Sequence, residues 1–135
     1  MASVSTRKPC STMVDPQEVI DESRPMLEEF LSDVCNYHPG QPIADVRLRD
    51  CLSDWIDKQD IGEDDFGWLV SRVAAFISEY LIEGYAAVRY IEGRHILLRL
   101  PIDASHGVYR EFDPYAAGLS RWGDRPYRVD ALRVA

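Results

Sequence analysis

The 135-residue chain is predicted to form a single α+β domain, in which three main helices pack on a small antiparallel β-sheet of about three strands with a short C-terminal helix. Two patterns predict this class. Apolar residues recur every three or four positions through about residues 16–83, as in amphipathic helices. Across residues 85–112 apolar and polar residues alternate instead, which is typical of strands. The length is that of about one domain.

The composition is that of an ordinary globular protein, with 46% apolar and 28% charged residues. Residues 1–14 are rich in Ser and Thr without an apolar pattern, so we expect a flexible N-terminal arm before a domain of residues 15–135. The arm lacks the apolar core of a secretory signal, and no run reaches the length of a membrane span. We therefore expect a cytoplasmic protein of a bacterial or similar cell, with its three cysteines reduced.

The first helical region begins at Asp15-Pro16, an N-cap followed by proline at the first helical position. Pro25 is expected to interrupt it, because proline lacks the backbone N–H that a helix interior requires. The sequence thus predicts a short helix at 16–22 and a longer one at about 24–37. The apolar stripe of the longer helix consists of Leu27, Phe30, Leu31, Val34 and Cys35.

Two further helices follow a break at residues 38–42, which contain two prolines and a glycine. The first of them is predicted at about 43–58. Its expected inward-facing residues are Val46, Leu48, Leu52, Trp55 and Ile56. The next, at about 64–83, is the most apolar and is expected to lie centrally, with Gly84 as its C-terminal cap.

The β-region is predicted to start with a hairpin, because Tyr85–Ile91 and Arg94–Leu100 alternate on either side of a Glu-Gly turn. Pro101 is expected to end the second strand, and residues 108–112 to form a third. Asp113-Pro114 then repeats the cap-and-proline pattern before a short helix at about 115–119. The tail to residue 135 is expected to be irregular or to contain one short strand.

The net charge of −8 is unevenly distributed along the chain. Residues 13–84 contain 17 Asp and Glu against 5 Lys and Arg, whereas residues 85–135 contain 6 acidic and 8 basic residues. An acidic helical region repels phosphates and attracts basic surfaces. This disfavours direct nucleic-acid binding through the acidic face and favours a basic protein partner.

The leading hypothesis is therefore a small, acidic, non-catalytic binding protein, such as an inhibitor, immunity or anti-defence protein of bacteria or phage. Its partner would be a basic protein, a class that includes nucleic-acid-handling enzymes recognised by charge mimicry. The candidate contact residues are carboxylates and C-terminal side chains of types enriched at interfaces: Glu28, Glu29, Asp33, Asp50, Asp54, Asp57, Glu63, Asp64, Asp65, Tyr115, Trp122 and Arg125. The simpler interpretation is that the carboxylates only confer solubility and the aromatics only complete the core. A secretion-type chaperone and an oligomerising subunit, such as a homodimer, are the alternatives.

A catalytic alternative is a small hydrolase, because Asp103, Ser105 and His106 are the residue types of a hydrolytic triad. The sequence has no Gly-x-Ser-x-Gly elbow, and the same residues are common turn formers.

A metal site is the remaining alternative, since Cys35 and His38 have the spacing of two ligands and Cys51 could be a third. No fourth ligand is evident, and both cysteines are otherwise expected to pack as small apolar groups. No cofactor is expected, because the chain has no glycine-rich phosphate-binding motif.

Overall fold

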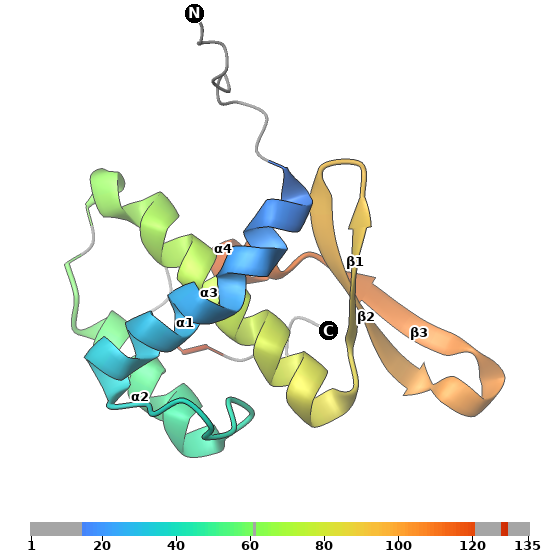
Figure 1. The fold of residues 1–135 in the computed structure, drawn as a ribbon, viewed down its shortest axis with the longest axis horizontal. Helices are drawn as coiled ribbons and strands as arrows, with labels where there is room; N and C mark the ends of the chain where they lie inside the picture. The colour runs from blue at the N-terminus through green and yellow to red at the C-terminus, as the bar shows by residue number, and fades with distance from the viewer. Residues whose placement is uncertain (1–14, 61, 121–127, 130–135) are drawn as a thin grey trace, which may run out of the picture.

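The computed structural model describes residues 15–60, 62–120 and 128–129 (Figure 1). The predicted α+β class is confirmed. Three main helices and a short fourth one pack on a three-stranded antiparallel sheet. The elements are α1 (Pro16–Cys35), α2 (Val46–Asp57), α3 (Glu63–Tyr85), β1 (Val88–Glu92), β2 (His95–Asp103), a 3-10 turn η1 (Ala104–His106), β3 (Val108–Phe112) and α4 (Pro114–Ser120). The predicted arm and most of the predicted tail lie outside the described residues.

α1 is one continuous helix, so the predicted break at Pro25 is wrong. Asp15 caps its start as expected, with a carboxylate oxygen 3.0 Å from the backbone nitrogen of Gln17. The ring of Pro25 lies on the exposed side of the helix. A proline in a helix interior costs about 3 kcal/mol, whereas burying one leucine gains about 1.5–3 kcal/mol. The complete burial of Leu27 and Leu31 beyond the proline therefore outweighs its cost.

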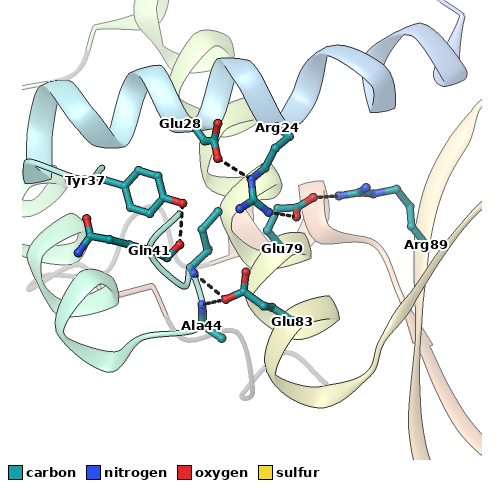
Figure 2. A network of polar contacts seen from close by, with 9 residues as sticks. Arg24, Glu28, Tyr37, Gln41, Ala44, Glu79, Glu83 and Arg89 are labelled. Carbon is teal, nitrogen blue, oxygen red and sulfur yellow. Dashed lines mark hydrogen bonds and ion pairs between the residues drawn. The ribbon is translucent and has the colours of Figure 1, made fainter. Parts of the chain in front are cut away.

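The connection between α1 and α2 is fixed by the end of α3. The Glu83 carboxylate accepts hydrogen bonds from the backbone nitrogens of Ile43 and Ala44, at 2.6 and 2.9 Å (Figure 2). Because their backbone nitrogens bond to Glu83, Ile43 and Ala44 do not join the helix that the sequence predicts from residue 43. α2 starts instead at Val46, which is 52% exposed rather than inward-facing.

Gly84 lies inside α3 and is not its cap, contrary to expectation. The left-handed residue that ends the helix is Ala86, with φ of 60°. A Cβ atom added to Gly84 would lie 3.0 Å from the Cβ atom of Ala44. The glycine thus allows the α1–α2 connection to approach the backbone of α3 closely.

The sheet is a meander in the order β1-β2-β3, which confirms the predicted hairpin and third strand. β2 continues past Pro101 to Asp103, so the prediction that Pro101 ends the strand is wrong. Pairing with β1 stops at Val88 opposite Arg99, so among the described strands Pro101 has no partner on that side. A missing N–H is tolerated at such an edge.

α3 lies at the centre of the core and contacts α1, α4 and the sheet. Glu79 of α3 also joins this helix to α1 and to the sheet, and its side chain is 12% exposed. Its carboxylate accepts from Arg24 of α1 at 2.9 Å and from Arg89 of β1 at 2.8 Å (Figure 2). Arg24 also donates to Glu28 at 3.0 Å. One acidic residue therefore links three elements.

Candidate protein-interaction surface

The most acidic described surface follows α1. Its exposed side carries a straight row of carboxylates, because positions separated by three or four residues share one face of a helix. The row spans about 22 Å at 1.5 Å per residue. We call it the α1 carboxylate line, and it consists of Glu18, Glu22, Glu29 and Asp33, with Asp21 beside it.

No cation of α1 neutralises this line. Arg24 is the one basic residue of the helix, and it points to Glu28 and Glu79 instead. Burial lowers the pKa of the Arg24 guanidinium, but the hydrogen bonds to Glu28 and Glu79 outweigh this and raise it. Glu28, predicted to contact a partner, is thus engaged within the molecule. Glu29 and Asp33 remain exposed, as predicted.

An exposed tryptophan lies beside the line, and sequence reasoning missed it. Trp68 of α3 is 46% exposed, and its ring lies edge-on to Phe30 of α1, with the centroids 5.5 Å apart. The Arg72 guanidinium stacks on Trp68, 4.1 Å from the ring centroid. Burial lowers the pKa of Arg72, and the charge of Glu29 opposes that shift, so the line and the tryptophan are neighbours. The sequence does carry a signal for an exposed tryptophan, because Trp68 does not belong to the apolar stripe of α3.

Further carboxylates lie at the start of α3. Asp64 and Asp65 are exposed in its first turn, where the helix dipole favours negative charge. They precede Trp68 by four and three residues and so share its side of the helix. Glu63 begins α3, but its side chain lies outside the described part of the structure. Trp68 is therefore flanked by carboxylates from two helices.

The α2 carboxylates are balanced by nearby cations, unlike those of α1. Residues 46–58 contain three acidic and three basic residues. In addition, Arg128 forms an ion pair with Asp54. The hydrogen bond to Asp54 and the charges of Asp57 and Asp50 raise the pKa of Arg128. Asp54, a predicted contact residue on α2, thus already forms an ion pair with an arginine of the same chain.

The docked position of Arg128 is supported by its neighbour. The Val129 backbone nitrogen donates to the Ser53 hydroxyl at 2.9 Å, and Val129 is buried. A groove of about 570 Å³ lies along the outer side of α2. It is lined by Val34, Arg47, Asp50, Cys51, Asp54, Trp55 and Lys58. Its mixed charges do not favour a basic partner over an acidic one.

Tyr115, the predicted aromatic contact in α4, lies beside the start of α1 and the start of β2. It is half-buried and lines a cavity of about 250 Å³ with Val19, His95 and Ile96, among others. Burial raises the pKa of its hydroxyl, and the charge of Asp113 adds to this. The other predicted C-terminal contacts, Trp122 and Arg125, lie outside the described residues.

The residues of the catalytic alternative do lie together in the turn between β2 and β3. Asp103 accepts from the Ser105 hydroxyl at 2.7 Å and lies 2.8 Å from His106 Nδ1. These two contacts, Ser105 first, lower the pKa of Asp103. The Ser105 hydroxyl is 3.3 Å from that same Nδ1. In a hydrolytic triad the carboxylate and the hydroxyl contact opposite ring nitrogens. The observed contacts are instead those of an exposed, side-chain-stabilised turn.

The residues of the metal alternative do not form a ligand cluster. Across residues 15–60, 62–120 and 128–129, no three His, Cys, Asp or Glu side chains are placed to share a metal ion. Cys35 is half-buried against the core, and burial, together with contact from Cys51, raises its thiol pKa. Cys51 is exposed, contrary to the prediction that it packs as an apolar group, and its Sγ lies 4.0 Å from the carbonyl oxygen of Val34. His38 is exposed, and its backbone nitrogen donates to the Gln41 side chain.

Comparisons with known proteins add no relative to this description. A scan against protein-family models, a search of the curated proteins and a search of the solved structures each found no match. None of the described helices has both the length and the apolar character needed to cross a membrane.

Proposed function

We propose that the protein is a small acidic binding module that docks on a basic protein through α1. The observation that carries this proposal is the α1 carboxylate line, which is exposed over about 22 Å and has no cation of its own helix to neutralise it. Such a row attracts a positively charged surface and speeds its approach. Inhibitors of nucleic-acid-handling enzymes are one class with this requirement.

The contact centre is assigned to Trp68, because charge alone gives rate more than affinity. Tryptophan and arginine are the residue types that most often dominate binding energy, and here Arg72 stacks on Trp68. Glu29, Asp64 and Asp65 supply a charged rim around this pair. A partner would thus present an apolar pocket or surface ringed by Lys and Arg.

The proposal is tested with two variants of equal net charge. In the line variant, Glu22, Glu29 and Asp33 are changed to lysine. In the control variant, the exposed residues Asp50, Asp60 and Glu92 are changed to lysine instead. Each protein is used to capture partners from the native cell at low and high salt, and the captured proteins are identified by mass spectrometry.

With the purified partner, association rates are then measured by stopped flow over a range of salt concentrations. We expect the line variant to associate about tenfold or more slowly and with a weaker salt dependence, whereas the control variant stays close to wild type. Trp68→Ala should instead speed dissociation. If the line and control variants lose binding equally, net charge and not the α1 line is responsible, and the assignment is wrong.

A further inference from the structure

β2 has the composition of a strand covered on both faces. It reads His-Ile-Leu-Leu-Arg-Leu-Pro-Ile-Asp, a nearly continuous apolar run. A strand with one face in water normally alternates between apolar and polar residues, whereas one buried on both faces does not. In the structure the helices lie on one side of the sheet (Figure 1). The second apolar face of β2 therefore needs an explanation.

The face of the sheet away from the helices is apolar around a single ion pair. Leu98 and Leu100 are buried against the helices, so the residues that alternate with them point the other way. The strand register places Val88, Arg99 and Glu111 side by side on this side, with Tyr90 opposite Leu97. We call this the open face, and it consists of Val88, Tyr90, Leu97, Arg99, Tyr109 and Glu111, with Glu92 and His95 at its β1–β2 turn end.

The one cation of the open face is already neutralised within it. Arg99 donates to Glu111 at 2.8 Å, and its guanidinium lies 4.9 Å from the Tyr90 ring centroid and 5.9 Å from that of Tyr109. Val88 is nevertheless 58% exposed and Tyr109 47% exposed. Exposed aromatic and β-branched side chains around a closed ion pair thus form the centre of the open face, and Glu92 is the one further carboxylate at its end.

The β2–β3 hairpin also projects past the helices (Figure 1). Beyond the last β1 pairing, β2 is hydrogen-bonded only to β3 among the described strands. Ile102 and Val108 lie in this projecting part and are 59% and 46% exposed. Both side chains extend the helix-facing side of the hairpin and not the open face, because Ile102 alternates with Pro101 and Val108 alternates with Tyr109.

We propose that two copies of this chain pack their open faces together, sheet on sheet, in a two-fold symmetric dimer. In such an interface each patch meets itself, so the patch must be self-complementary. The open face comes close to this condition, because Arg99 and Glu111 neutralise each other and leave Glu92 as its one further carboxylate. The α1 carboxylate line does not, because it would face its own negative charge. A largely apolar sheet face whose central ion pair is closed thus favours a second copy, whereas the acidic helices favour a basic partner.

The size of the open face predicts a weak dimer. β2 is nine residues long, or about 30 Å. The sheet is about 14 Å wide where all three strands overlap, at Leu98 and Arg99, and narrower elsewhere. This is smaller than a standard specific interface, so a weak dimer with a dissociation constant on the order of micromolar or above is expected. Each chain carries a net charge of −8, so salt should tighten the dimer by screening the repulsion between copies.

The test is sedimentation velocity of the full chain from about 1 to about 500 µM, a range that brackets the expected dissociation constant, at low and high salt. We expect a monomer–dimer equilibrium that shifts toward dimer as salt rises. Val88→Glu and Tyr109→Glu should each raise the dissociation constant at least about tenfold, a loss typical of a central apolar contact. Val46→Glu is the matched control, since this valine is 52% exposed on α2, and it should leave the constant unchanged.

A wild-type protein that stays monomeric at every concentration overturns the proposal, as does a dimer that the control weakens equally. If either open-face variant fails to fold by circular dichroism, backbone amide shifts of the wild type are followed on dilution. Shifts confined to the strands support the proposal, and shifts confined to α1 overturn it. Capture of a basic partner weakens with salt, whereas this dimer tightens, so the two proposals fail independently.

Discussion

At the scale of the residue, Glu79 has the most consequential position among the acidic residues. Its side chain is 12% exposed and contacts Arg24 and Arg89 from different elements. A charge removed from water requires partners of opposite sign, and removing one partner leaves the others uncompensated. The network thus contributes less through attraction than through the cost of breaking it.

Glu79→Gln is expected to lower the free energy of unfolding by about 2 kcal/mol, because two arginines lose their shared carboxylate. The loss is smaller than for a fully buried pair, since Arg24 keeps Glu28 and is partly exposed. Urea denaturation measures the change. Glu92→Gln, in the exposed hairpin, is the control and should change stability by less than about 0.5 kcal/mol. Equal effects of the two variants would contradict this role for Glu79.

At the scale of the element, α1 contains two prolines in different helical contexts. Pro16 occupies the first turn, where the missing N–H has no intrahelical acceptor to lose. Pro25 lies inside the helix, where a hydrogen bond to the preceding turn is lost. The helix tolerates this second proline because its buried side packs on α3 through residues on both sides of it.

Pro25→Ala should therefore stabilise the protein by about 1–3 kcal/mol, because alanine restores the helical hydrogen bond while the unfolded chain gains some freedom. The expected readout is a higher melting temperature by circular dichroism. Pro16→Ala should give no such gain, since proline is favoured at that position. A larger gain from Pro16→Ala than from Pro25→Ala would show that the interior proline is not strained.

At the scale of the whole molecule, charge divides the surface into two regions with opposite preferences. Residues 15–65 contain 15 acidic and 4 basic residues, whereas residues 85–113 contain four of each. The α1 carboxylate line and the open face of the sheet are formed by different elements. The two proposed contacts can therefore be made at once.

This separation predicts that each contact survives loss of the other. Changing Glu22, Glu29 and Asp33 to lysine adds two charges per site and moves the net charge from −8 to −2. At low salt this variant should lose its basic partner yet dimerise at least as tightly as wild type, because the copies repel less. Val88→Glu should show the reverse behaviour in the same sedimentation and stopped-flow measurements. A single variant that abolishes both contacts would mean that they are one interface.

Local pattern in the sequence determined the elements and their order. The change of period from helical to alternating placed the helices before the strands, and the third strand has the predicted bounds. Caps at Asp15 and Asp113 were also readable, because an Asp-Pro pair at a helix start acts through backbone groups only two or three residues away. The uneven charge could likewise be predicted, because it follows from counting acidic and basic residues along the sequence.

Only the tertiary structure decided which charges remain available. Asp54 belongs to the same acidic set as Glu29 and Asp33, yet it meets Arg128, and Arg24, which pairs locally with Glu28, also reaches Glu79 of α3. It also showed that Gly84 provides close packing and not a cap. The physical reason is the same in most cases: Asp54 and Arg128 are 74 residues apart, and Gly84 meets Ala44 across a 40-residue gap in sequence. A periodic pattern reports the face on which a side chain lies, whereas its partner is set by the packing of distant segments.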